Sequence, residues 1–224
     1  MKNKYTLLSN SVINKLMSLS LFIFSILIAN NFTSQTACTG TYTYSTTLTV
    51  PSSGYSESFE SVPTGSGSQY YTQTSGYAGW GRCSVASGNT AYWQVYSGST
   101  TSGGTGPSSA QNGSRYVFVE ASYPNNPSYT ARLGRNVNLA ALSSTATLTF
   151  YRHIYGTATG TLKVFVNGTV KGTYSGSSNS WILTTIDLSQ YAGTTCEIEF
   201  VYLTGSGWSS DCGIDNLSIS GSSG

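Results

Sequence analysis

The residues that could carry acid–base or nucleophilic chemistry are few and scattered. The single histidine, His153, falls in a strand-like Thr/Tyr pattern, and the chain has neither a Gly-x-Ser-x-Gly elbow nor a His-Glu-x-x-His zinc motif. Glu197 and Glu199 would lie side by side on one strand face, whereas glycosidase carboxylates flank the scissile bond from opposing walls. We therefore expect a structural His153, two glutamates on a solvated strand face and no catalytic residue.

Asp215 is the acidic residue that most needs a partner. It lies in the C-terminal run Gly213-Ile-Asp-Asn-Leu-Ser-Ile, in phase with Leu217 and Ile219, so we expect it to point inward beside them. A carboxylate among apolar neighbours costs several kcal/mol unless it is paired. Its partner is expected to be either a cation or hydrogen-bond donors, such as backbone N–H groups or an arginine.

Aromatic side chains offer a different chemistry, that of recognition. The chain has 17 Tyr and 4 Trp, and such rings serve both protein contacts and stacking on sugars. Trp208 lies in a Gly/Ser-rich turn and is predicted to be the most exposed tryptophan, whereas the other three are expected in the core or as loop anchors. The tyrosines expected to be exposed in loops are Tyr70, Tyr71, Tyr77 and Tyr123.

The four cysteines all follow an N-terminal apolar segment, and an even count in an exported chain favours disulfides. Three connectivities are open. Cys196 and Cys212 flank a Gly-Ser-Gly turn and could face each other across a hairpin, which would leave Cys38 to pair with Cys83. The spacings match no common zinc pattern.

The N-terminus has the features of an export signal. Three lysines accompany an apolar run from Leu16 to Ala29, which is short for a membrane span of roughly 20 residues. We predict a cleaved signal peptide over residues 1–35 and a secreted or cell-surface protein. An uncleaved membrane anchor and a lipoprotein attached at Cys38 are the alternatives.

The charge balance excludes one class of partner. Without the three signal lysines, 7 basic residues (10 − 3) face 8 acidic ones. Nucleic-acid binding needs a basic stripe that neutralises phosphates, so we expect no nucleic-acid partner.

Short alternating runs separated by Gly, Ser and Thr clusters predict an all-β sandwich or barrel. The predicted strands are Thr41–Val50, Tyr55–Ser61, Ala91–Tyr96, Arg115–Ala121, Tyr129–Leu133, Ala146–Ile154, Thr161–Val166, Val170–Tyr174, Ser180–Leu188, Cys196–Leu203 and Gly213–Ser220. At the Asn167-Gly168 turn, a two-residue type I′ loop would pair core residues of one strand with surface residues of the next. A three-residue loop with a bulge at Gly168 keeps the apolar residues of both strands on one face, so we predict that loop.

Several of these segments, taken in order, resemble the MAM domain, a jelly-roll module of extracellular proteins. The segments that carry the resemblance are Ser58-Phe-Glu, Gly104-Thr-Gly-Pro, Gly113-Ser-Arg-Tyr-Val-Phe-Val-Glu, Leu148-Thr-Phe-Tyr-Arg-His-Ile-Tyr-Gly, Gly160-Thr-Leu-Lys-Val-Phe-Val, Trp181, Ile198-Glu-Phe and Gly213-Ile-Asp-Asn-Leu-Ser-Ile. The resemblance implies a two-sheet antiparallel β-sandwich of jelly-roll type over residues 55–220. Residues 36–54 would form a lead-in and residues 221–224 the start of a linker or the chain end. The N-terminal signal and the composition rich in Ser, Thr, Gly and Tyr also resemble those of surface proteins of Bacteroidetes-type bacteria.

The resemblance also implies a cation site near the joined first and last strands. Glu60 matches the family's Phe-Glu and Asp215 its closing acid, and Glu57 and Asp211 lie close by in sequence. Together these four carboxylates would form a structural calcium site. The sequence departs from the family just before Phe59, where Ser56-Glu-Ser stands in place of a segment that often holds a cysteine, and at Asn216, which replaces a second aspartate.

The function implied is that of an extracellular, non-catalytic adhesion or protein-interaction module. The alternative is a carbohydrate-binding module that accompanies a secreted hydrolase. A protein or glycan ligand at the cell surface is the expected partner, and further domains in a longer chain are compatible with either reading.

Overall fold

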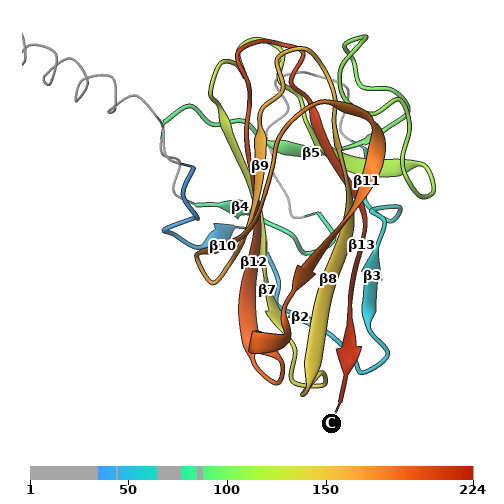
Figure 1. The fold of residues 1–224 in the computed structure, drawn as a ribbon, viewed down its shortest axis with the longest axis vertical. Coiled ribbons are helices and arrows are strands. Elements are labelled where there is room, and N and C mark those ends of the chain that lie inside the picture. The colour runs from blue at the N-terminus through green and yellow to red at the C-terminus, as the bar shows by residue number, and fades with distance from the viewer. Residues whose placement is uncertain (1–34, 44, 65–76, 85–87, 224) are drawn as a thin grey trace, which may run out of the picture. The chain divides into compact units, whose positions relative to one another are not determined.

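The structure, a computed structural model, describes residues 35–43, 45–64, 77–84 and 88–223. These residues form the predicted all-β sandwich, in which two sheets pack face to face and all strand pairs but one, Leu48–Thr49 against Thr130–Asn138, are antiparallel (Figure 1). The predicted signal peptide lies outside the described residues except for Gln35. In the described part of the chain, no helix has the length and apolar character needed to span a membrane.

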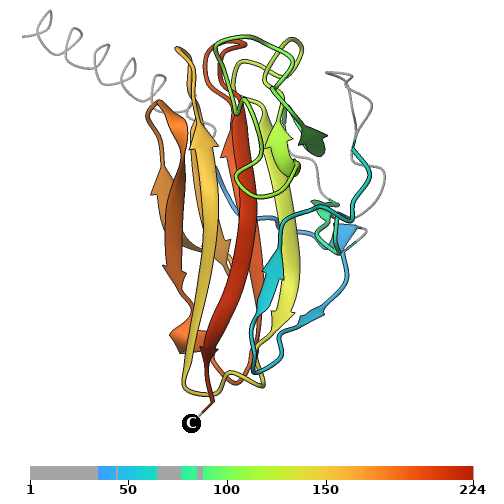
Figure 2. The ribbon, with the colours of Figure 1, turned by 90° about the vertical axis from the view of Figure 1, so that its right-hand side faces the viewer.

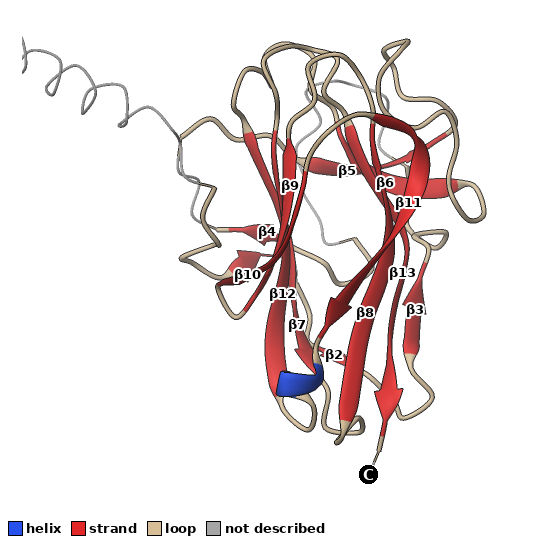
Figure 3. Ribbon diagram, in the orientation of Figure 1, coloured by secondary structure: helices blue, strands red, loops and turns tan. Residues whose placement is uncertain are grey.

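Most strands agree with the alternating segments of the sequence, but the predicted strand Thr41–Val50 is divided into two short strands, the strand expected at Tyr129–Leu133 continues to Asn138, and Arg82–Cys83 was not predicted. Within the described residues, the one helical turn is the 3-10 helix η1 (Figure 3). The elements are β1 (Tyr42–Thr43), β2 (Leu48–Thr49), β3 (Tyr55–Glu57), β4 (Arg82–Cys83), β5 (Trp93–Ser97), β6 (Arg115–Val119), β7 (Thr130–Asn138), β8 (Thr145–Ile154), β9 (Thr161–Val166), β10 (Thr169–Tyr174), β11 (Ser178–Asp187), η1 (Ser189–Tyr191), β12 (Thr195–Leu203) and β13 (Cys212–Ser222).

The β12 sheet has the strand order β10-β9-β12-β7-β2, and the β13 sheet has the order β11-β8-β13-β6-β5. The short β3 also pairs with β13, and Figure 2 shows the two strands side by side. A separate two-stranded ribbon joins β1 to β4. Consecutive strands therefore often lie in different sheets, as the long β12–β13 connection illustrates.

The core lies between the two sheets. Phe150 of β8 and Phe200 of β12 meet edge to face with ring centroids 5.0 Å apart, and Trp80 lies 5.5 Å from Phe200. Alternate residues of β8 and β12 contribute Leu148 and Ile198 to the same buried layer. Because side chains alternate along a strand, the two-residue period of the sequence correctly predicted which residues of β8 and β12 form this inner layer.

The turn between β9 and β10 differs from the prediction. Val166 pairs with Thr169, so Asn167 and Gly168 alone form the turn, with φ of 46° and 74°, as a type I′ turn requires. The bulge lies inside β10 instead, where the register shifts between Val170 and Gly172. This later bulge restores the face alternation that the predicted three-residue loop was meant to provide.

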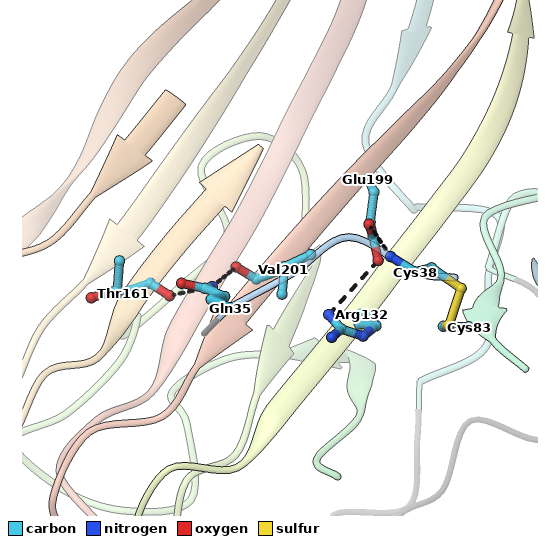
Figure 4. Close-up of polar contacts among 7 residues, drawn as sticks. All are labelled: Gln35, Cys38, Cys83, Arg132, Thr161, Glu199 and Val201. Atoms are coloured by element: carbon cyan, nitrogen blue, oxygen red, sulfur yellow. Dashed lines mark hydrogen bonds and ion pairs between the residues drawn. A yellow bond between two sulfur atoms is a disulfide. The ribbon is translucent and has the colours of Figure 1, made fainter. Parts of the chain in front are cut away.

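An N-terminal strap, residues 35–43, crosses the outer face of the β12 sheet. The side-chain amide of Gln35 donates hydrogen bonds to Thr161 O (3.0 Å) and Val201 O (2.5 Å), and the Cys38 amide donates to Glu199 Oε2 (2.9 Å) (Figure 4). The predicted Cys38–Cys83 disulfide is present, with a Cα–Cα distance of 5.7 Å. The strap is thus fixed at two points on the domain.

The strap explains why Glu199 is buried, contrary to the expectation of a solvated glutamate. Its side chain is 1% exposed and lies 4.0 Å from the Arg132 guanidinium. Burial raises the pKa of Glu199. The hydrogen bonds from the Cys38 amide and the Tyr42 hydroxyl and the charge of Arg132 lower it, but by less than burial raises it. Glu197, which points to the same side, stays partly exposed because the strap does not cover it fully.

Gly134 of β7 lets the strap lie close to the sheet. A Cβ at this position would come within 2.2 Å of the Tyr42 ring. We expect Gly134→Ala to lower the free energy of unfolding by about 1–3 kcal/mol, because the ring must shift. Urea unfolding of Gly134→Ala with and without Tyr42→Ala tests this, and an equal cost in both backgrounds would contradict the steric explanation.

The predicted Cys196–Cys212 disulfide is wrong, since both are buried free cysteines. Cys196 lies near the start of β12, about seven strand residues or roughly 23 Å from the end of that strand. The chain then crosses to the other sheet, where Cys212 begins β13. The two residues therefore lie toward opposite ends of the sandwich, not across a hairpin.

Candidate functional site: the loop end of the sandwich

Four loops meet at the end of the sandwich opposite the end of β13, and we call this region the loop end. They are residues 98–114, 120–129, 155–160 and 204–211. Hydrogen bonds cross-link them: Gly106 N to Tyr155 O (3.1 Å), Ala121 N to Asp211 Oδ1 (2.9 Å), Ser128 N to Gly205 O (3.4 Å) and Ala158 N to Ser209 O (3.2 Å). The loops therefore support one another as a single surface.

Two large aromatic side chains project from this surface. Trp208 is 53% exposed in the loop 204–211, and Tyr123 is 76% exposed in the loop 120–129. Their exposure was expected from the sequence. Tyr77, also expected to be exposed, is only 2% exposed and packs in the core, where a local bridge to Trp80 turns it inward. Tyr70 and Tyr71 lie outside the described residues.

A small polar cavity of about 230 Å³ opens in the loop 98–114. Hydroxyl-bearing residues and glycines line most of it, together with Tyr155 and Asn179. The Thr100 hydroxyl donates to Thr105 O (2.7 Å), and the Thr105 hydroxyl donates to Tyr155 O (3.0 Å), so the loop is held from inside.

Beneath this loop, the outer face of the β13 sheet carries a row of aromatic rings. Neighbouring rings meet at steep angles: Tyr116 and Trp181 are 5.8 Å apart at 76°, and Tyr96 and Phe118 are 5.2 Å apart at 57°. The Trp181 indole donates to Ser109 O (3.0 Å) and so anchors the loop over the row. The rings are tilted against one another, and Tyr116 and Phe118 are buried, which does not suit stacking on a flat sugar chain.

His153 belongs to this row and not to a catalytic constellation. Its ring lies 5.3 Å from Trp181 and 6.3 Å from Tyr155, and the residue is 3% exposed. Burial lowers the pKa of His153 to about 4, against a weaker opposing hydrogen bond with Asn179. A base whose pKa lies this far below neutral is poorly suited to proton transfer, and no carboxylate among the described residues forms an ion pair with it.

The four carboxylates predicted to share a calcium ion are separately engaged. Glu57 accepts from Phe59 N (2.6 Å) and the Tyr55 hydroxyl (3.1 Å). Glu60 accepts from the amides of Ser114 (2.9 Å) and Arg115 (2.7 Å). Across the described ranges, no three His, Cys, Asp or Glu side chains come together as a metal-binding group. The predicted four-carboxylate site is therefore not assembled.

Asp215 is buried, but it points away from the core, which corrects the predicted direction. Asn216 adopts a φ of 46°, and the register of β13 against β8 shifts between Asp215 and Ser218, so the alternation of faces is reset. Asp215 consequently faces the loop 98–114 and accepts from the amides of Gln111 (2.8 Å) and Asn112 (3.0 Å). Backbone donors are thus the partner that the buried carboxylate required.

Asp211 has an acidic neighbour that sequence reasoning missed. Asp211 is fully buried beside Glu120, which is 2% exposed. The two residues are 91 positions apart, and only the meeting of β6 with the start of β13 brings them together. No local pattern in the sequence signals this pairing.

Similar folds occur among solved structures. The K1 cleaved adhesin domain of Lys-gingipain from Porphyromonas gingivalis W83 is 16% identical, with 76% of this chain and 99% of that chain covered and a TM-score of 0.52. The K2 cleaved adhesin domain of Lys-gingipain is 18% identical, with 75% and 99% covered and a TM-score of 0.54. These likenesses concern the fold. In sequence, residues 74–223 match the family described as MAM domain, meprin/A5/mu.

Proposed function

This chain belongs to the MAM domain family (meprin/A5/mu), and on that premise we propose that it is an exported, non-catalytic adhesion or protein-interaction module. The observation that carries the proposal is the pair of exposed aromatic residues, Trp208 and Tyr123, on hydrogen-bonded loops. Aromatic anchors on a supported surface are typical of binding hot spots, because their rings bury much area at little entropic cost. The buried, neutral His153 supports a role without chemistry.

Carbohydrate binding is the second candidate. The cavity lined by hydroxyl groups and Tyr155 favours it, because polar groups next to an aromatic ring suit sugar recognition. Against it, the described surface offers two separate exposed aromatics and no open row of parallel rings.

Binding to two immobilised panels, one of extracellular-matrix proteins and one of glycans, distinguishes the candidates. We expect retention on a protein of the first panel, and we expect Trp208→Ala or Tyr123→Ala to weaken it about 10- to 30-fold. Leu183→Ala is the matched control, since Leu183 is 55% exposed on β11, outside the four loops. Retention on the glycan panel alone would favour the second candidate. Protein binding that is insensitive to both aromatic substitutions would reject the loop end as the binding surface.

A further inference from the structure

The edge of β11 is a surface that the proposed function does not use. β11 is one of the four strands that end the two sheets, together with β10, β2 and β5. The other three offer little to an added strand: β2 has two residues, the first three residues of β5 are buried, and β10 is interrupted by the register shift between Val170 and Gly172. β11, by contrast, pairs with β8 in regular register from Ile182 to Asp187.

The hydrogen bonds of β11 show which of its backbone groups point outward. Leu188 N donates to Ala146 O (2.8 Å) just beyond the strand. In an antiparallel pair, residues bonded to the partner strand alternate with residues whose backbone groups point away from it. Counting back along the regular register, the N–H and C=O groups of Leu183, Thr185 and Asp187 therefore point away from β8. All three residues are exposed, and no other described segment bonds to these backbone groups.

The regular part of β11 also lacks the features that usually protect a sheet edge. Lysine, proline and bulges on an edge strand hinder pairing with other chains. The segment Ile182-Leu-Thr-Thr-Ile contains none of them, and its β-branched residues favour an extended backbone. Leu183 is 55% exposed and presents an apolar side chain beside the open backbone groups. The edge is therefore free to pair with a further strand.

We propose that this edge binds an extended segment of a partner protein, which adds an antiparallel strand to the β13 sheet. The outward backbone groups of Leu183, Thr185 and Asp187 would bond to the segment, as in strand addition to other open sheet edges. Cross-strand pairing defines its chemistry: an apolar residue opposite Leu183, a β-branched residue opposite Thr185 and a basic residue opposite Asp187. Because the strands run in opposite directions, the basic residue precedes the apolar one by 187 − 183 = 4 positions.

A second copy of this chain is a poorer match for the edge. Two β11 strands related by a two-fold axis must place outward-bonding residues opposite one another. An axis at Thr185 would set Leu183 against Asp187, and an axis at Asp187 would set two carboxylates together. An axis at Leu183 would require the stretch before Ile182, where the register shift interrupts the pairing. The edge therefore complements a different chain better than itself.

This site is separate from the loop end. Asp187 pairs with Thr147 near the start of β8, whereas the loop 155–160 follows the end of β8. The inference goes beyond the proposed function, because it assigns a second surface with its own partner. Trp208→Ala should leave binding at the β11 edge unchanged, so the failure of either proposal leaves the other standing.

The test is a titration of the purified, oxidised protein with a short, end-blocked synthetic peptide. The peptide carries lysine, valine and leucine at alternate positions, so that they face Asp187, Thr185 and Leu183 in antiparallel pairing. We expect saturable binding of one peptide per chain. N-methylation of the valine should weaken binding by about tenfold or more, because its N–H would bond to β11. N-methylation of the next residue, whose N–H points away, should have little effect.

Variants of the protein test the register. Asp187→Lys should weaken binding about 5-fold, and a peptide with glutamate in place of lysine should restore it. Leu183→Ala should weaken binding about 3-fold and serves as a second variant if Asp187→Lys fails to fold. Val170→Ala is the matched control, since Val170 is a 44% exposed apolar residue on the edge strand of the other sheet.

Three outcomes would overturn the proposal. The first is no saturable binding at about 1 mM peptide, a concentration that detects even weak complexes. The second is an equal effect of the two N-methylations. The third is self-association in sedimentation analysis that Leu183→Ala abolishes while the peptide does not bind, which would make a second copy the occupant of the edge.

Discussion

Replacing Cys38 and Cys83 together with serine should lower the free energy of unfolding by about 4 kcal/mol. The disulfide closes a chain segment of 45 residues, and the chain-entropy model gives this figure for a loop of that length. The loss should be visible in urea unfolding as a lower midpoint. Because Cys38 also presents its amide to Glu199, loosening the strap weakens a contact of the buried glutamate.

Reductant provides the control for this prediction. Dithiothreitol should bring the unaltered protein close to the stability of the double variant and leave the variant itself unchanged. Thiol titration of the unfolded, unreduced protein should find two free thiols, those of Cys196 and Cys212. A count of zero would mean that a second bridge forms and would contradict the arrangement described above.

Acidification from pH 7 to pH 4 should lower the free energy of unfolding by about 3 kcal/mol through His153 alone. Burial lowers the pKa of His153 from 6.5 to about 4. The unfolded chain therefore takes up a proton near pH 6.5, whereas the folded protein does so only near pH 4. The stabilisation is complete above pH 6.5, falls as the pH drops toward 4, and changes no further below that.

The measurement is the difference in unfolding free energy between the unaltered protein and His153→Phe across this pH range. Phenylalanine keeps a ring against Trp181 but cannot titrate. The difference is needed because burial also raises the pKa of Asp215 to about 6 and that of Asp211 to about 8, and both carboxyls favour the folded state as the pH falls. A difference that stays constant between pH 7 and pH 4 would contradict the buried, neutral His153.

The inner layer of the fold could be predicted from the sequence because it depends on local alternation. Leu148 and Phe150, or Ile198 and Phe200, repeat every second residue, and this period alone places them between the sheets. The same logic failed wherever a strand departs from regular pleating. The bulges at Asn216 and within β10 each move the following side chains to the opposite face of the sheet. The alternating pattern of the sequence does not predict where either bulge lies.

The outer layers could not be predicted because segments remote in sequence cover them. Glu199 is buried by a strap that begins 164 residues earlier, and Asp215 is met by the amides of Gln111 and Asn112. Cys196 and Cys212 looked like hairpin neighbours only while their strands were taken to be in one sheet. The exposed Trp208 and Tyr123 were foreseeable, since turn-rich loops at strand ends lie on the surface.

The strap has a consequence for the order of folding. Gln35 bonds to the carbonyl of Val201, 166 residues later, so its site exists only once the penultimate strand is in place. Contacts of such long sequence separation form slowly, because loop-closure entropy is lost before they stabilise the chain. Residues 35–43 can therefore dock only after β12 has formed, and until they do, Glu199 and the outer face of β12 remain open to water and to other chains.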